Sequence, residues 1–126
     1  MRNDFQLSRH FNLQEFDSAD TGEVILESEL VLRLERLREL VGRPIFVVSG
    51  YRTPEHNRFV GGEDNSFHLR GMASDITWSG IEMKRAVALA EKVGFNGIGQ
   101  YPDKHSIHVD VRGWKARWIK IAGRFV

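Results

Sequence analysis

The sequence contains no cysteine, and this absence narrows the kinds of site that the chain can carry. Disulfide bonds, thiolate nucleophiles and the cysteine-rich zinc sites of small structural domains are all excluded. Any metal ion must be held by histidine and carboxylate side chains, a ligand set that is more typical of catalytic sites than of structural ones.

Long apolar runs are also missing. No segment approaches the roughly 20 consecutive apolar residues that span a bilayer, so we expect no membrane partner. The first six residues, MRNDFQ, are polar and lack the apolar core of a secretory signal. We therefore expect a protein that is cytoplasmic when synthesised and that reaches a cell wall only if it is exported or released, as a phage or prophage protein would be.

Neither sign of charge is in excess. The chain has 18 basic and 17 acidic residues, a formal charge of +1, and its basic positions are scattered, which makes nucleic acid a weak candidate partner. Its 126 residues, 41% of them hydrophobic, suffice for one core but not for two ordinary domains. We predict a single domain over residues 1–126 and a monomer.

Apolar periodicity and the positions of glycine and proline predict helices alternating with short strands. Residues 1–26 have no clean period and are expected to form an irregular strap. Ser79 and Glu82 have the spacing of a capping box. The expected helices are 28–41, 54–60 and a third after the capping box, ending at Gly94; the expected strands include 45–48, 73–78, 106–111 and a stretch around 118–121. The close succession of the last strands favours antiparallel pairing and an α+β fold with a central, mainly antiparallel sheet.

Three residues form a candidate metal site: His68, Asp75 and His108. His68 and Asp75 are seven positions apart with Gly71 between them, and His108 follows far downstream, so the three residues cannot share one helix face. The spacing fits a loop residue and two strand residues that meet across a sheet. Two imidazoles and one carboxylate are ligands that zinc accepts, and they leave a fourth position open. Strand alternation places Ser106, His108 and Asp110 on one face, opposite the apolar Ile107 and Val109.

Several segments together resemble a known family. They are Ser49–Pro54 with Asn57, Gly61–Gly62, Ser66–Asp75 and Ile107–Asp110, and the likeness reaches back to Leu7–Phe11 and Glu15–Phe16. In these segments the chain resembles the zinc D-alanyl-D-alanine carboxypeptidases, which include VanX-type and VanY-type enzymes and phage endolysin peptidases. The likeness is strongest to the short, phage-like and cell-wall-associated branch whose second metal motif reads His-x-Asp.

The resemblance implies the α+β fold shared with the hedgehog signalling domain, with one zinc ion at the positions of His68, Asp75 and His108. It also implies a peptidoglycan stem peptide as substrate, cleaved by carboxypeptidase or endopeptidase action. The alternative is a zinc-stabilised module of the same fold that binds cell wall, or belongs to a virion, without catalysis.

The general base stays open at this point. In relatives with an acidic residue-x-x-His motif, the base is the acidic residue three positions before the last ligand, and this chain has His105 there. The candidates are His105 by alignment, Asp110 by strand alternation and Asp103 by its turn. Asp110 has a competing role, since ligating histidines commonly donate their second ring N–H to a carboxylate.

Two further residues are expected to contact substrate. Arg52 follows a buried strand, and the resemblance places it against a substrate carboxylate or the oxyanion; the alternative is a surface pair with Glu55. Ser66 matches a family serine that contacts substrate, although it could simply cap its loop. Trp114 and Trp118 are expected to serve in packing and are left out of the site.

Overall fold

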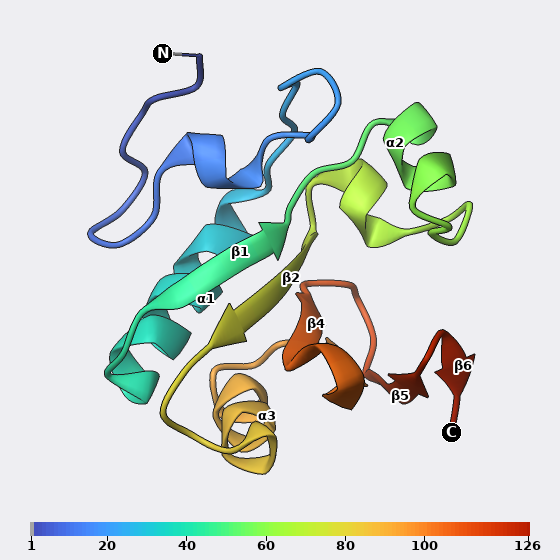
Figure 1. Cartoon of the computed structure of the whole chain (residues 1–126). Coiled ribbons are helices and arrows are strands. Elements are labelled where there is room, and N and C mark those ends of the chain that lie inside the picture. The colour runs from blue at the N-terminus through green and yellow to red at the C-terminus, as the bar shows by residue number, and fades with distance from the viewer. Residues whose placement is uncertain (1) are drawn as a thin grey trace.

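The computed structural model describes residues 2–126, and a six-stranded mixed sheet lies at its centre (Figure 1). The strands are β1 (Ile45–Ser49), β2 (Ala73–Trp78), β3 (Gly97–Tyr101), β4 (Ser106–Asp110), β5 (Ala116–Ile121) and β6 (Arg124–Phe125), in the spatial order β1-β2-β4-β3-β5-β6. All neighbouring strands are antiparallel except β3 and β5. The predicted α+β fold with a mainly antiparallel sheet is confirmed.

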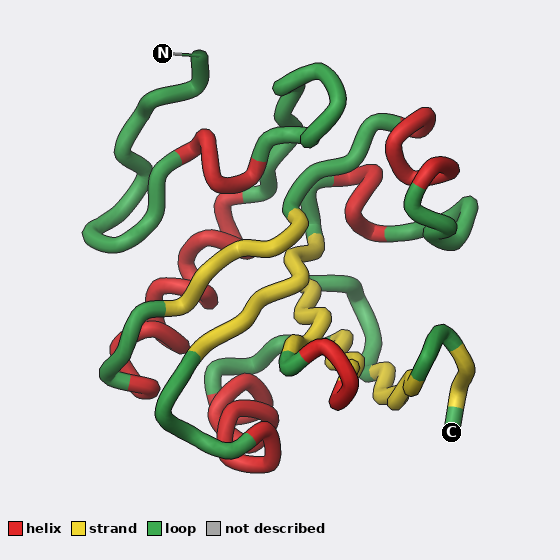
Figure 2. The backbone as a smooth tube through the Cα atoms, in the orientation of Figure 1, coloured by secondary structure: helices red, strands yellow, loops and turns green. Residues whose placement is uncertain are grey.

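Three α-helices and three short 3₁₀ turns precede or connect the strands (Figure 2). They are α1 (Ser28–Val41), α2 (Pro54–Phe59), α3 (Met83–Lys92), η1 (Leu13–Phe16), η2 (Phe67–Arg70) and η3 (Pro102–Lys104). α1 ends as expected at Gly42, which adopts the left-handed conformation at φ 72° and donates its N–H to the Arg38 carbonyl. α2 begins where Thr53 accepts a hydrogen bond from the His56 N–H and Pro54 takes the first helical position.

The two faces of the sheet have different characters. Ile76, Ile107, Val109 and Ile98 point to one face and join a buried apolar cluster with residues of α1 and α3. The other face carries Asp75 directly opposite His108. The alternation expected for β4 is confirmed, because Ile107 and Val109 are fully buried in the core while His108 lines a pocket on the opposite face.

The segment before α1 is mostly irregular, as expected, with η1 as its one helical turn among the described residues 2–26 (Figure 2). Phe11 and Phe16 bury their rings completely in the core. Glu35 on α1 ties the segment down: its carboxylate accepts hydrogen bonds from the Ser8 hydroxyl at 2.7 Å, the His10 N–H at 2.8 Å and His10 Nδ1 at 2.6 Å. Burial pushes the pKa of Glu35 upward, but these donors outweigh it and hold the pKa below its usual value.

We expect Glu35→Ala to lower the free energy of unfolding by about 1–3 kcal/mol at neutral pH, because three donors lose a charged acceptor. Since the folded-state pKa of Glu35 is depressed, its contribution is present above the usual carboxyl pKa and is lost as the pH falls through the folded-state value. Urea denaturation at pH 7 and pH 3 measures both effects. Glu39→Ala, on the exposed side of the same helix, is the control; equal losses for the two variants would contradict the prediction.

Three details of the fold differ from the sequence-based expectation. The capping box is wrong: α3 begins at Met83, its N-cap is Glu82, and no side chain caps it among the residues that the structure describes. Ser79 instead lies in a turn with Gly80, which has a φ of 88°. The parallel pairing of β3 with β5 and the short strand β6 were not anticipated.

Within residues 2–126, no helix is both long and apolar enough to cross a membrane.

Candidate metal centre

A single cross-strand row carries two of the candidate ligands. Ser49, Asp75, His108, Gly99 and Trp118 lie side by side on β1, β2, β4, β3 and β5. Side chains in such a row share one face of the sheet. The antiparallel register of β2 and β4 therefore brings Asp75 and His108 together although they are far apart in sequence.

The third candidate ligand, His68, comes from η2, which precedes β2. Ser66 caps this turn by accepting a hydrogen bond from the His68 N–H at 3.2 Å. Gly71 ends it in the left-handed conformation at φ 68°, and a side chain at this position would collide with the Ile25 backbone. Gly71 thus makes a sharp turn between His68 and Asp75, which brings His68 over the start of β2.

Hydrogen bonds orient both imidazole rings. His68 Nδ1 lies 2.7 Å from the Gly50 carbonyl oxygen, which can only accept, so Nδ1 carries the proton and Nε2 is left with a lone pair. His108 Nε2 lies 2.6 Å from Asp110 Oδ2, so a neutral His108 donates there and leaves the lone pair on Nδ1. Each free nitrogen lies 3.4 Å from Asp75 Oδ1.

The donor set fits a bound cation. Asp75 Oδ1 is buried and accepts no hydrogen bond from the described residues 2–126, which is unfavourable for a carboxylate oxygen unless a cation is present. One ligand atom from each of His68, Asp75 and His108 lies within 4.8 Å of the others. Ligand atoms about 2.0–2.1 Å from a tetrahedral zinc ion are about 3.3–3.4 Å apart, which matches the two separations from Asp75. The three residues therefore form a group that could hold a metal ion.

The electrostatics of the group favour ionised carboxylates. Burial pushes the pKa of Asp75 upward, but His68 and His108 outweigh it, so the pKa lies well below its usual range. Burial pushes the pKa of His108 downward, but its hydrogen bond to Asp110 and the negative charge of the nearby Asp75 outweigh it and the pKa is raised. The carboxylate of Asp75 is thus available as an anionic ligand at neutral pH.

Asp110 lies beneath His108 and is completely buried. Its Oδ2 accepts from His108 Nε2, and both of its oxygens also accept hydrogen bonds from Arg112. Burial pushes its pKa upward, but these donors hold it well below the usual range. Gly97 leaves room for this carboxylate, because a side chain at Gly97 would collide with it. This geometry matches the competing role of Asp110, in which its carboxylate accepts a hydrogen bond from the second ring N–H of the candidate ligand His108.

Arg52 contacts the group from the end of β1. Its Nη2 donates to Asp75 Oδ2 at 3.1 Å, its Nη1 to Asn57 Oδ1 at 3.2 Å and its Nε to Ser49 Oγ at 3.1 Å. The alternative surface pair with Glu55 is wrong, since Glu55 lies 3.9 Å from Arg58 and Arg52 pairs with Asp75. Arg52 thus links a candidate ligand to the cavity in front of it.

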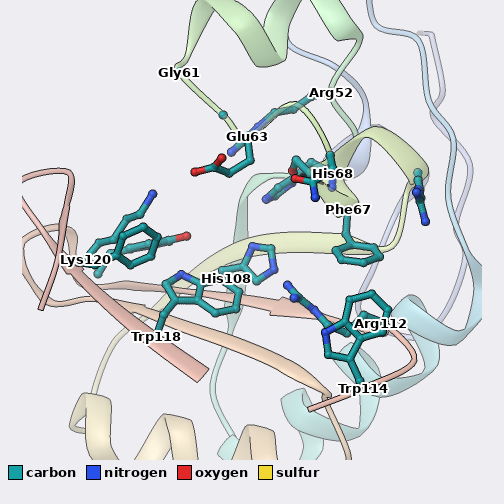
Figure 3. A pocket seen from close by; sticks show the side chains of 16 residues that line it. Arg52, Gly61, Glu63, Phe67, His68, His108, Arg112, Trp114, Trp118 and Lys120 are labelled. Atoms are coloured by element: carbon teal, nitrogen blue, oxygen red, sulfur yellow. Dashed lines mark hydrogen bonds between the residues drawn. The ribbon is translucent and has the colours of Figure 1, made fainter. Parts of the chain in front are cut away.

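Arg52, His68 and His108 line a pocket of about 440 Å³ (Figure 3). Arg52 and Glu63 lie on one side of it, and Trp118 and Lys120 lie across from them. Tyr101 also lines the pocket; burial first, and then the charge of Asp75, raise its pKa to about 12, so its hydroxyl stays protonated at neutral pH. The pocket therefore offers cationic side chains, the neutral hydroxyl groups of Tyr101 and Ser66, and the Glu63 carboxylate.

An aromatic wall borders the pocket. Trp118 packs over Gly99, which has no side chain, and its ring centroid lies 4.9 Å from that of His108. Trp114 meets Phe67 edge to face at 5.7 Å. Trp114 and Trp118, which were expected to serve in packing, both also line the pocket. Only the parallel pairing of β3 with β5 brings Trp118 to His108, and no local pattern in the sequence indicates that pairing.

The structure brings together the three candidate ligands, Arg52, Ser66 and Asp110, but not His105. His105 precedes β4 at φ 48°, about 10 Å along the strand from His108. Its Nε2 lies 3.0 Å from the Trp78 carbonyl oxygen, and its ring packs at a tilt against that of Trp78, with the ring centroids 4.8 Å apart. Asp103 accepts a hydrogen bond from the Ala122 N–H. Neither His105 nor Asp103 lines the pocket.

Comparison with known proteins agrees with this geometry. A probable peptidoglycan L,D-endopeptidase, MepK of Haemophilus influenzae, is 35% identical over 79 residues, which cover 56% of this chain and 42% of that relative. The aligned region is thus less than half of the relative's length. The family model of peptidase M15 matches residues 2–110, a region that contains all three candidate ligands. The chain belongs to the peptidase M15 family.

Proposed function

We propose that the chain is a zinc peptidase that hydrolyses amide bonds in the peptide part of peptidoglycan. The observation that carries the proposal is the convergence of two imidazole lone pairs on Asp75 Oδ1, which has no hydrogen-bond partner among the described residues, with both histidines lining a pocket. Membership of a peptidase family supports hydrolysis, and the peptidoglycan endopeptidase relative supports the substrate class.

His68, Asp75 and His108 would hold one zinc ion. Such an ion supplies Lewis-acid polarisation of a carbonyl group and lowers the pKa of water. The residues around it have separate roles. Gly50 and Asp110 fix which nitrogen of each imidazole faces Asp75. Arg52 neutralises the outer oxygen of Asp75, which keeps that carboxylate in one orientation.

Arg52 and Ser66 are proposed to position the substrate. Arg52 lines the pocket, and a guanidinium there attracts a substrate carboxylate or the negative charge that develops on the scissile carbonyl oxygen. Ser66 caps η2 with its oxygen and also lines the pocket, so its hydroxyl hydrogen is available to a substrate carbonyl. Tyr101 on β3 lines the same pocket and adds a neutral hydroxyl donor.

The proton acceptor is proposed to be Glu63. Asp110 has both oxygens occupied by His108 and Arg112, and His105 and Asp103 lie away from the pocket. Among the pocket-lining residues that the structure describes, Glu63 supplies the carboxylate. Its backbone is held by a hydrogen bond from Asn57 Nδ2 to its carbonyl at 2.8 Å, while its side chain is exposed to the cavity (Figure 3).

We expect Glu63→Gln to lower kcat about a hundredfold or more with zinc affinity unchanged, because a general base contributes about 10²–10⁴-fold. Glu55→Gln, an exposed acid on α2, is the control. An unchanged rate for Glu63→Gln together with a large loss for His105→Ala would return the role to His105.

Digestion of defined muropeptides by the zinc-loaded protein, read by mass spectrometry, tests the proposed function. We expect internal cleavage of the peptide, because the similar protein of Haemophilus influenzae is a probable L,D-endopeptidase. Release of a single terminal alanine would identify a carboxypeptidase instead. If zinc binds but no product forms between pH 5 and 9, the chain is a non-catalytic module of this fold and the proposed function is wrong.

A further inference from the structure

Arg112 lies in the loop after β4, next to the candidate metal centre. Within residues 2–126, its side chain forms no hydrogen bond or ion pair with any of the three candidate ligands. Its side chain is only 14% exposed. Sequence reasoning gave it no role. Its surroundings are nevertheless highly specific, because a buried carboxylate lies on one side of the guanidinium and aromatic rings lie around it.

The contacts of Arg112 with Asp110 use both oxygens of that carboxylate. Arg112 Nη2 donates to Oδ2 at 2.7 Å, Nε lies 3.0 Å from each oxygen, and the Arg112 backbone N–H donates to Oδ1 at 3.1 Å. Fork-shaped contacts of this kind fix the plane of a carboxylate as well as its position. The same Oδ2 is the acceptor for His108 Nε2 at 2.6 Å. Arg112 thus fixes the Asp110 carboxylate, and the same carboxylate accepts a hydrogen bond from His108.

Three aromatic rings hold the guanidinium itself. Its carbon lies 4.6 Å from the centre of the Phe67 ring, 5.2 Å from that of Trp118 and 5.7 Å from that of Trp114. These distances are within the range of cation–π attraction, which is stronger where water is excluded. Phe67 belongs to η2, next to His68, and Trp118 contacts the His108 ring. The arginine therefore links the segments that carry two of the three ligands.

We propose that Arg112 is a positioning residue that acts on the metal centre through Asp110. With Asp110 held in place, the Nε2–H of His108 has a charged acceptor, and Nδ1 keeps its lone pair directed at Asp75. Without the fork, the buried carboxylate can rotate, and His108 can place its proton on Nδ1, where it blocks metal binding. The inference rests on the proposed function in taking zinc as the bound ion.

The pocket suggests a competing role for Arg112, because the residue also lines the cavity and its Nη1 could bind a substrate anion. The two roles differ in what they change. A substrate contact affects KM and leaves the empty protein as it was. A positioning residue changes the metal affinity and the protonation pattern of His108 before any substrate is present.

The test uses Arg112→Gln, Arg112→Lys and, as matched control, Arg70→Gln. Arg70 also places its guanidinium over the Phe67 ring, at 5.4 Å, but lacks the bonds to Asp110. Zinc affinity is measured by competition with a chromophoric chelator. We expect it to fall about 10–100-fold for Arg112→Gln, as is usual for the outer partners of metal ligands. The zinc affinity of Arg112→Lys, which keeps the charge but not the fork-shaped contacts, should lie between those of the wild type and Arg112→Gln. The zinc affinity of the control should stay within about twofold of that of the wild type.

A second readout needs neither zinc nor turnover. The ¹⁵N spectra of the histidine side chains of the metal-free protein report which nitrogen of His108 carries the proton. At a pH alkaline enough for the ring to be neutral, we expect Nε2–H in the wild type and a mixture of tautomers in Arg112→Gln. If that variant does not fold, Arg112→Lys carries the same comparison.

Wild-type zinc affinity and an unchanged tautomer in the Arg112 variants, with only KM raised, would overturn the proposal and make Arg112 a substrate contact. Failure of the wild type to cleave muropeptides would instead contradict the proposed function and leave the affinity and tautomer comparisons valid. The two failures are therefore distinguishable.

Discussion

His68→Ala is expected to abolish tight zinc binding and to lower kcat/KM for a muropeptide by about a thousandfold or more. The substitution removes the ring nitrogen that lies 3.4 Å from Asp75 Oδ1 and leaves two ligands where three are needed. A catalytic metal contributes several kcal/mol of transition-state stabilisation, and each 1.36 kcal/mol corresponds to a factor of ten in rate. Zinc content by mass spectrometry of the intact protein and muropeptide turnover measure the two effects.

The control for this prediction is His56→Ala. His56 lies on α2, where its ring stacks on Phe59 at 6.3 Å, outside the pocket. We expect zinc content and turnover to stay at wild-type levels in this variant. Full zinc binding by His68→Ala, or equal losses in both variants, would remove His68 from the ligand set.

Phe16→Ala is expected to lower the free energy of unfolding by about 3–5 kcal/mol, the range for deleting a buried phenylalanine ring. Phe16 is fully buried, its ring centroid lies 6.0 Å from that of Phe11, and its carbonyl oxygen accepts the Tyr51 N–H at 2.8 Å. Because domains of this size are stable by only about 5–15 kcal/mol, the variant should unfold at a much lower urea concentration.

Phe5→Ala is the matched control, since Phe5 belongs to the same segment and is 64% exposed. Its loss should cost less than about 0.5 kcal/mol. Gly50, whose carbonyl orients His68, packs directly against the Phe16 backbone. We therefore also expect weaker zinc binding by Phe16→Ala under conditions where it is still folded. Equal stability of the two variants would show that the N-terminal segment does not form part of the core.

Local patterns predicted most helices and strands correctly. α1 follows its apolar repeat and stops at Gly42, and α2 begins at Thr53 and Pro54, because these signals act over a few residues of chain. The start of α3 was wrong because Ser79 and Glu82 satisfy the spacing of a capping box, while Gly80 at φ 88° turns the chain before the helix. The β3–β5 pairing joins residues that no local signal connects.

The candidate ligands were predictable for a different reason. His68, Asp75 and His108 lie in motifs that resemble those of a family, and strand alternation places Asp75 and His108 on one face. The base was not predictable in this way. Alignment favours His105 as the base. However, His105 adopts the left-handed conformation at φ 48°, and its ring lies against Trp78, away from the pocket.

By itself, the sequence determined the α+β class, the boundaries of most helices and strands, and the three residues that could hold a metal ion, because periodicity, caps and motifs are local properties of the chain. Only the tertiary structure decided what surrounds those residues. The order of the strands places Trp118 over Gly99 against His108, and the burial of Asp110 makes it the partner of His108 and Arg112. Such contacts depend on the register and order of distant strands, which tertiary packing sets and local sequence does not encode.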